Sequence, residues 1–264
     1  MVTLVQTAYA AEGGLSIHLA PEVLGTLFGV PITSTLLTVW LGMALLIVTA
    51  AVVKHTIKPV PGKLQNIFEA LLGGVFDYMS DVLESKTLAT KFFPLVMTIF
   101  LFILTMNWIG MLPGMDSIGI YEPSHTPSEA VDKLIPFFHS PSTDLNITIG
   151  LALIAFVSIE LAGVLMLGVT KYAGKFFNFS SPLKFAIGII ELISELARLI
   201  AFSFRLFGNI FAGETLLLVV AFLTTPYFVP IPLIAYEFFV GFIQAFIFAI
   251  LTLYFIKIAV EEPH

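Results

Sequence analysis

The sequence of 264 residues contains no cysteine and few charged residues. The missing cysteines exclude disulfides, thiolate catalysis and metal sites built from cysteine. Only 11% of the residues are charged, about half the share in an average soluble domain, and 58% are apolar. The five histidines lie outside the strongly apolar runs, and none is paired at a spacing typical of metal ligands. The composition therefore predicts a polytopic membrane protein without a metal or another cofactor.

Apolar stretches divide the sequence into segments that are long enough to cross a membrane, which takes about 20 residues. Four such spans are predicted over residues 31–53, 92–112, 145–170 and 234–260. A further stretch, 183–222, contains no proline and would form a helix of about 60 Å, about twice the thickness of the hydrocarbon core. It must therefore lie strongly tilted or partly along the membrane surface. We expect an all-α protein with about five spanning helices, folded as a single membrane domain over residues 1–264.

The remaining segments predict the sidedness of the chain. Residues 62–86 combine apolar side chains at helical spacing with mixed charges, which is typical of an amphipathic helix along the cytoplasmic interface. We expect residues 1–30 to form an external tail and 113–144 an external loop rich in proline and acidic residues, with Asp144 capping the next span. Of the 12 Lys and Arg residues, only Lys133 falls on the predicted outer side. The positive-inside rule places the N-terminus outside and the C-terminus in the cytoplasm.

Arg205 lies in the long predicted helix, with six uncharged residues before it and eight after it. A charged side chain at this depth costs from about 2.5 to about 17 kcal/mol, so it indicates a functional site. A structural ion pair with a carboxylate on another span is the alternative. Helical geometry places Asn209 on the same face as Arg205 and Glu214 on the opposite face. Gly208 and Gly213 would allow another helix to approach closely.

The last predicted helix adds further polar residues at membrane depth. Glu237 and Gln244 are seven residues apart and therefore share one face of this helix. A short proline-rich turn places the helix beside the end of the long one, so Glu214 and Glu237 are expected in the outer part of the membrane. Asn209 and Gln244 would lie deeper. This gradation predicts a polar path that enters from outside, although Gln244 alone could also serve to hold two helices together.

A second polar path is predicted toward the cytoplasmic end of the long helix. Glu191, Ser194 and Glu195 lie there, within a turn or so of one another. Exposure to the cytoplasm is the alternative for Glu195. Arg205 would lie between the two paths.

Several segments resemble subunit a of the F-type ATP synthases. The most specific are 204–214 (FRLFGNIFAGE) and 244–248 (QAFIF), and further hallmark segments match at 107–110, 113–116 and 144–146. The resemblance extends from about residue 31 to the C-terminus. It implies the static half of a rotary proton motor in a bacterial inner membrane. The implied partners are a ring of c subunits, b-type stator subunits, the remaining ATP synthase subunits and membrane lipid, with no nucleic acid.

The resemblance also implies roles for individual residues. Arg205 would be the essential arginine at the ring, and Glu191 and Ser194 would belong to an inner half-channel. The implied outer half-channel is lined by four residues: Asn209, Glu214, Glu237 and Gln244. The chain would couple proton translocation through the two offset half-channels to rotation of the ring and to ATP synthesis or hydrolysis, without being catalytic itself. Many relatives pair a histidine with a glutamate at the positions of Glu214 and Glu237, and the loop 117–143 is longer here than in the usual bacterial form.

Arginine suits this role because it stays charged and cannot itself relay a proton. At about 4 Å and an effective dielectric near 20, its attraction for a carboxylate is about 4 kcal/mol, or about three pKa units. A proton-coupled secondary transporter with a buried Arg–Glu pair is the alternative function. The absence of an inverted repeat and the small number of spans argue against it. Intramembrane hydrolysis would lack a histidine base within a span.

Overall fold

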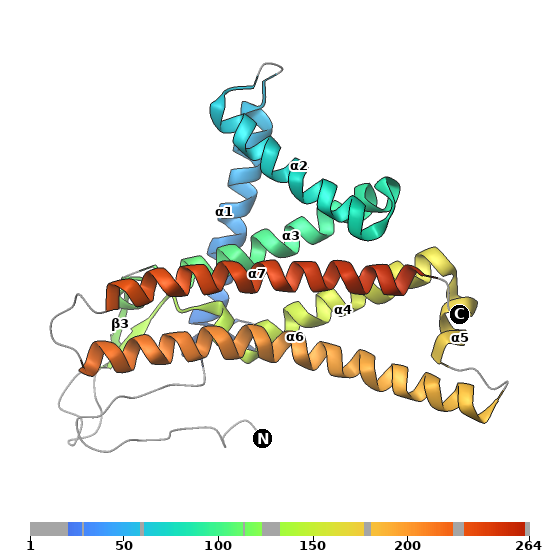
Figure 1. Cartoon of the computed structure of the whole chain (residues 1–264). Helices are drawn as coiled ribbons and strands as arrows, with labels where there is room; N and C mark the ends of the chain where they lie inside the picture. The colour runs from blue at the N-terminus through green and yellow to red at the C-terminus, as the bar shows by residue number, and fades with distance from the viewer. Residues whose placement is uncertain are drawn as a thin grey trace. The chain divides into compact units, whose positions relative to one another are not determined.

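The computed structural model describes residues 21–27, 29–58, 61–112, 114–122, 133–176, 181–223 and 230–261. Within these ranges the chain forms seven α-helices and two small antiparallel sheets (Figure 1). The helices are α1 (Ser34–Thr56), α2 (Lys63–Leu83), α3 (Lys86–Gly110), α4 (Leu145–Leu167), α5 (Val169–Phe176), α6 (Pro182–Leu223) and α7 (Pro230–Val260). This architecture confirms the predicted all-α polytopic class.

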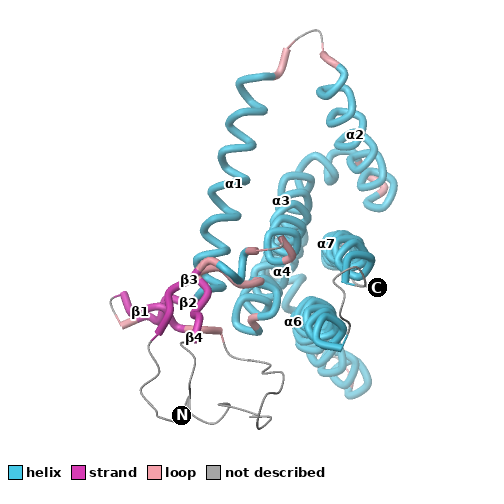
Figure 2. Tube along the Cα trace, turned by 90° about the vertical axis from the view of Figure 1, so that its left-hand side faces the viewer, coloured by secondary structure: helices cyan, strands magenta, loops and turns pink. Residues whose placement is uncertain are grey.

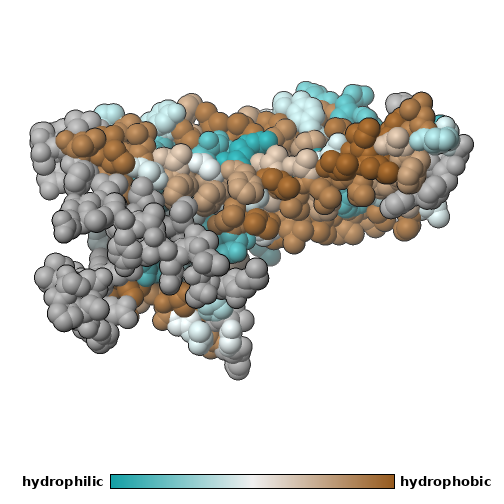
Figure 3. Space-filling model, turned by 90° about the horizontal axis from the view of Figure 1, so that it is seen from below, coloured by the Kyte–Doolittle hydropathy of each residue, from teal (hydrophilic) through white to brown (hydrophobic). Residues whose placement is uncertain are grey.

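Four of these helices, α1, α3, α4 and α7, are long and apolar enough to cross a membrane. Helix α6 has 42 residues and carries charged side chains along its length, which sets it apart from the other four. It is the long helix expected over 183–222. Apolar side chains cover much of the face seen in Figure 3, as contact with lipid requires.

The chain divides into two compact units, and each is described by itself. The first unit comprises the described residues of Met1–Ile47, Phe102–Thr148 and Arg205–Gln244. The second unit comprises those of Val48–Leu101, Ile149–Phe204 and Ala245–His264. Helices α1, α3, α4, α6 and α7 contribute residues to both units.

Several helix boundaries differ from the predicted spans by two to six residues, and two of these differences have a clear local cause. Helix α3 begins six residues before the predicted start at residue 92, because the Ser85 hydroxyl accepts the N–H of Leu88 at 3.3 Å and caps the helix. Helix α4 ends at Leu167, three residues before the predicted end, because Gly168 adopts a left-handed conformation with φ +82°. The short helix α5 follows, between the predicted span 145–170 and the long predicted helix 183–222.

The first unit contains both hairpins, where the sequence predicts only a tail and a loop. Strand β1 (Val23–Leu27) pairs with β2 (Val30–Thr33), and β3 (Gly119–Glu122) pairs with β4 (Lys133–Pro136). The strands lie together in Figure 2. Each has only four or five residues, too few for an alternating pattern to stand out in the sequence, and each depends on the backbone of its partner.

Hydrogen bonds from buried polar side chains join the helices of the first unit. The Asp144 carboxylate accepts the N–H of Asn146 at 2.9 Å and therefore caps α4, as predicted. Its other oxygen accepts a hydrogen bond from the Thr35 hydroxyl at 2.8 Å. On the other side, the fully buried Asn107 amide donates to the Gly241 carbonyl at 2.9 Å and accepts from the Ser142 hydroxyl at 2.6 Å. These bonds join the start of α1 to the cap of α4, and they join the end of α3 to α7 and to the segment before α4.

In the second unit, α2 packs against α3 and α7 around an apolar cavity of about 330 Å³. The ring of Phe202 on α6 stacks on Phe248 of α7 at a centroid distance of 4.7 Å. At the end of α2, the exposed Glu84 accepts a hydrogen bond from Lys257 at 2.7 Å. This hydrogen bond and the lysine charge lower the pKa of the Glu84 carboxyl.

Candidate functional site

Glu237 of α7 and Gly213 of α6 meet inside the first unit. The Glu237 side chain is only 4% exposed, and a Cβ added to Gly213 would overlap its carboxylate. The glycine therefore provides the space that the carboxylate occupies, which is the close helix approach predicted at this residue. At Gly208, the other glycine singled out by the sequence, an added Cβ would have no neighbour within 4 Å.

One oxygen of the Glu237 carboxyl group, Oε2, is buried and makes no hydrogen bond within the part of the chain that the structure describes. Burying such an atom costs free energy unless it is protonated, hydrated or bound by a partner. Gln244 is also buried, seven residues farther along the same face of α7, which is about 10 Å by the rise of an α-helix. Helix α7 thus buries two polar groups in succession.

Glu214 has a neighbour that the sequence did not reveal. Nε2 of His139 lies 3.9 Å from its Oε2, and the two side chains are 33% and 26% exposed. The segment after β4 carries His139, whose backbone N–H donates to the Thr38 hydroxyl of α1 at 3.1 Å. No local pattern marks this histidine, because the contact joins residues 75 positions apart in the chain. A histidine therefore stands beside a glutamate here although neither α6 nor α7 supplies it.

The structure does not group all of the predicted residues. Asn209 is exposed on α6, and Ser194 is exposed with its hydroxyl donating to the Ile190 carbonyl at 2.9 Å. Both belong to an open face of α6 rather than to a buried cluster. Arg205 is half-buried on the same helix.

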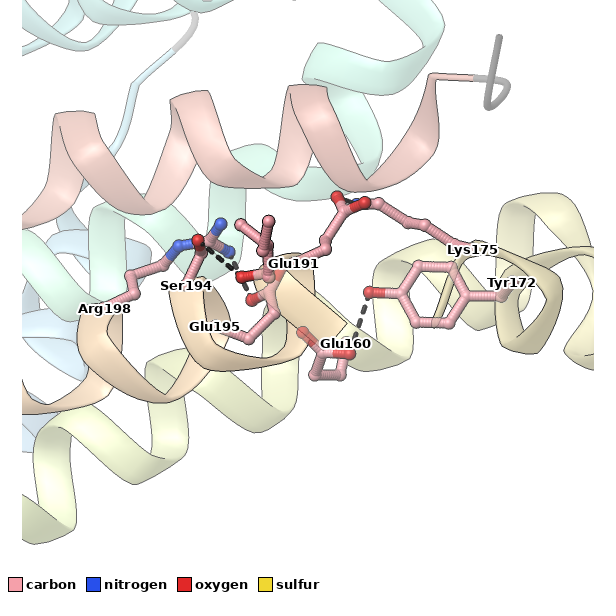
Figure 4. A network of polar contacts seen from close by, with 8 residues as sticks. Glu160, Tyr172, Lys175, Glu191, Ser194, Glu195 and Arg198 are labelled. Carbon is pink, nitrogen blue, oxygen red and sulfur yellow. Dashed lines mark hydrogen bonds and ion pairs between the residues drawn. The ribbon is translucent and has the colours of Figure 1, made fainter. Parts of the chain in front are cut away.

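A second cluster of ionisable groups lies in the second unit, between α4, α5 and α6 (Figure 4). Lys175 of α5 pairs with Glu191 of α6, Nζ to Oε1, at 2.8 Å. One turn along α6, Arg198 donates from Nη1 to Oε2 of Glu195 at 2.7 Å, and the Glu195 side chain is 5% exposed. The guanidinium of Arg198 also lies over the Phe255 ring at 3.7 Å. The sequence predicted Glu191 and Glu195 here but neither of their partners.

Glu160 and Tyr172 complete this second cluster. The Tyr172 hydroxyl of α5 donates to Oε2 of Glu160 on α4 at 2.8 Å. Burial and this hydrogen bond raise the pKa of the Tyr172 phenol far above its ordinary value, so the hydroxyl keeps its proton and remains a donor. A Cβ added to Gly163 would overlap the Tyr172 ring, so the glycine admits the ring to α4.

Within the described ranges, no group of three or more His, Asp or Glu side chains could hold a metal ion. The chemistry that both clusters offer is acid–base chemistry. Each unit contains a buried carboxyl group, Glu237 or Glu195, and a more exposed acid, Glu214 or Glu191, on α6. This is the arrangement that proton transfer between the membrane interior and water needs.

Comparison with known proteins adds independent information. Residues 36–257 match the family described as ATP synthase A chain. ATP synthase subunit a of Campylobacter jejuni subsp. jejuni serotype O:23/36 (strain 81-176) is 36% identical over 223 residues, covering 83% of this chain and 87% of the relative. The protein of that name from Geotalea daltonii is 33% identical over 228 residues, covering 85% and 86%.

Proposed function

The chain belongs to the ATP synthase subunit a family, and from this premise we propose that it passes protons through two offset half-channels against a rotating ring of c subunits. As a member of the family it translocates protons in the membrane sector of the F-type ATP synthase and is not itself catalytic. The observation that carries the proposal is that the ionisable groups along α6 fall into two separate clusters. Helix α6 contributes to one cluster through Gly213 and Glu214 and to the other through Glu191 and Glu195, with Arg205 between them in the sequence.

The polar groups of the first unit, His139, Glu214, Glu237 and Gln244, form the first cluster and support an outer half-channel. His139 and Glu214 are partly exposed, so water can deliver a proton to them. Glu237 is buried and has an oxygen that can take up a proton, and Gln244 lies deeper along α7. A proton would pass from the exposed pair to Glu237 and then toward the ring.

The second cluster supports an inner half-channel. The Glu195 side chain is 5% exposed, whereas the Glu191 side chain, at the Lys175 ion pair, is 32% exposed. A proton that leaves the buried Glu195 would therefore next reach Glu191, which can exchange protons with water. Ser194, exposed on α6, would line the face of this path that the ring covers. Protons would leave here on the cytoplasmic side of a bacterial inner membrane.

Arg205 would act between the two half-channels. A permanent positive charge about 4 Å from a ring carboxylate, at an effective dielectric near 20, favours the ionised form by about 4 kcal/mol, or about three pKa units. It would strip the proton from each passing carboxyl group and repel protons that cross directly between the paths. The open face of α6 that includes Asn209 is where the ring would pack. The b-type stator subunits would hold the chain against rotation.

The substitution Arg205→Ala tests this function. ATP synthesis driven by a proton gradient should vanish while the complex still assembles, and passive proton leak should persist or rise because the paths are no longer separated. Arg205→Lys keeps the charge but loses the planar fork, so synthesis should be severely reduced rather than normal. Synthesis and passive proton permeability are measured in the same vesicles. Normal synthesis by an assembled Arg205→Ala complex would falsify the proposal.

A further inference from the structure

We propose that Glu160 and Glu195 form a carboxyl pair that shares one proton and serves as the buried proton-holding site of the inner half-channel. The direction in which the proton moves through this site rests on the proposed function. The carboxyl pair itself is inferred from residues of the second unit alone.

The two carboxyl groups come from different helices and meet between them. Glu160 projects from α4 and Glu195 from α6, the two side chains are neighbours in the network of Figure 4, and the charge of Glu160 acts on Glu195. Each is held from its far side by one donor, Glu160 by the Tyr172 hydroxyl at 2.8 Å and Glu195 by Arg198 at 2.7 Å. Both donors bind Oε2 of their glutamate. The arrangement orients the two carboxyl groups through one neutral donor, Tyr172, and one cationic donor, Arg198.

Oε1 of Glu160 is buried and makes no hydrogen bond within the described residues. Because Tyr172 keeps its own proton and already occupies Oε2, a proton on this pair can reside on Oε1. A carboxyl group protonated there can act as a donor toward Glu195. The proton would satisfy an atom that is otherwise a costly buried acceptor.

The charges of the cluster require one proton for neutrality. Three carboxyl groups, Glu160, Glu191 and Glu195, face two cations, Lys175 and Arg198. Lys175 is paired with Glu191 and Arg198 with Glu195, whereas Glu160 accepts its hydrogen bond from the neutral Tyr172 hydroxyl. Two neighbouring carboxylates repel each other strongly in a low-dielectric interior, and one proton on the pair removes this repulsion. One shared proton brings the five groups to zero net charge.

The position of the pair fits a transfer site rather than a mere structural contact. Glu195 lies ten residues before Arg205 on α6, about 15 Å along the helix axis, and one turn from the partly exposed Glu191. An incoming proton would bond to an oxygen of the pair as it leaves the ring carboxyl group. The proton already held would then pass to water beside Glu191. One O–H bond forms as another breaks, so the pair returns to its starting charge after each transfer.

Infrared spectroscopy of the whole complex detects the shared proton directly. The carbonyl stretch of a protonated carboxyl group is absent from carboxylates, and difference spectra between wild type and variant isolate one group. Glu160→Gln and Glu195→Gln should each remove one carboxyl band, because the remaining glutamate ionises beside Arg198. The double variant should remove no more than either single one. Glu69→Gln, on the exposed side of α2, is the matched control and should leave the spectrum unchanged.

Two further measurements separate transfer from structure. Tyr172→Phe deletes the hydrogen bond to Glu160 and should shift the frequency of the band without removing it. This variant keeps both glutamates and serves as the readout even where Glu160→Gln does not assemble. Gradient-driven ATP synthesis should fall about a hundredfold in assembled Glu160→Gln, the low end for loss of a positioned acid or base.

Unchanged spectra in both single variants would overturn the shared proton, and so would the loss of two bands in the double variant. Band loss with normal ATP synthesis would overturn its place in the half-channel. These outcomes differ from those for Arg205→Ala, which leaves the carboxyl pair intact. If the Arg205→Ala complex is inactive and shows no carboxyl band at the pair, only this inference is refuted. If the Arg205→Ala complex synthesises ATP, the proposed function is refuted, and the infrared spectra still show whether Glu160 and Glu195 share a proton.

Discussion

Gly213→Ala places one methyl group where the Glu237 carboxylate lies. The added Cβ would overlap that carboxylate, so the buried side chain must move. Overpacking of this kind costs about 1 to 3 kcal/mol, whereas alanine in a helix is about 1 kcal/mol more favourable than glycine. The free energy of unfolding should therefore fall by about 0 to 2 kcal/mol, and the complex should still assemble.

The functional effect should be larger than the loss of stability. A displacement of about 1 Å in a reacting group can cost about a hundredfold in rate, so proton entry through Glu237 should slow by about ten- to a hundredfold. The assay is ATP synthesis in vesicles after an imposed proton gradient, with the amount of assembled complex measured separately. Glu237→Asp in the same chain shortens the side chain by one methylene group and should restore part of the rate.

Gly150→Ala is the matched control, because a Cβ added at this glycine of α4 meets no atom within 4 Å. It should synthesise ATP at the wild-type rate. If assembled Gly213→Ala does so as well, the position of the Glu237 carboxylate does not limit proton entry, and the assignment of this residue to the outer half-channel is wrong.

Two further predictions concern the outer side of the protein. His139→Ala should slow gradient-driven ATP synthesis severalfold because Glu214 loses its partner at 3.9 Å, and added imidazole should restore part of the rate; a wild-type rate in this variant removes the histidine from proton entry. Single cysteines introduced at the exposed positions Thr56 and Ser117 of this cysteine-free chain should react with impermeant reagents from the cytoplasmic and the outer side, respectively, and labelling of both from one side contradicts the predicted topology.

In both clusters a glycine on one helix leaves the space into which an ionisable side chain from another element packs. Gly213 leaves room for Glu237, and Gly163 leaves room for Tyr172, which positions Glu160. In each case a missing side chain on one helix lets an ionisable group enter from another. Small substitutions at these glycines should therefore change proton transfer without removing any titratable group.

The sequence by itself determined the helical architecture. Long apolar runs must satisfy their backbone hydrogen bonds internally in a membrane, so their length alone predicts helices such as α1 and α7. Local chemistry likewise predicted the Asp144 cap, because a cap depends on residues two or three positions away. It offered Gly208 and Gly213 alike as places for a close approach, and only packing decided that Gly213 faces Glu237 whereas Gly208 has no neighbour within 4 Å of an added Cβ. The charges of α6 predict that it carries functional residues, because a charge at membrane depth is costly.

Only the tertiary structure decided which ionisable groups meet. His139 reaches Glu214 because the segment after β4 is fastened to Thr38, and Tyr172 reaches Glu160 because Gly168 ends α4 and turns the chain into α5. The strands of both hairpins were missed for the same reason, since each is stabilised by a partner rather than by its own residues. Periodicity reports which face of a helix a side chain occupies, whereas an ion pair or a shared proton depends on distances of a few ångströms between separate elements. Those distances come from packing, which no single segment encodes.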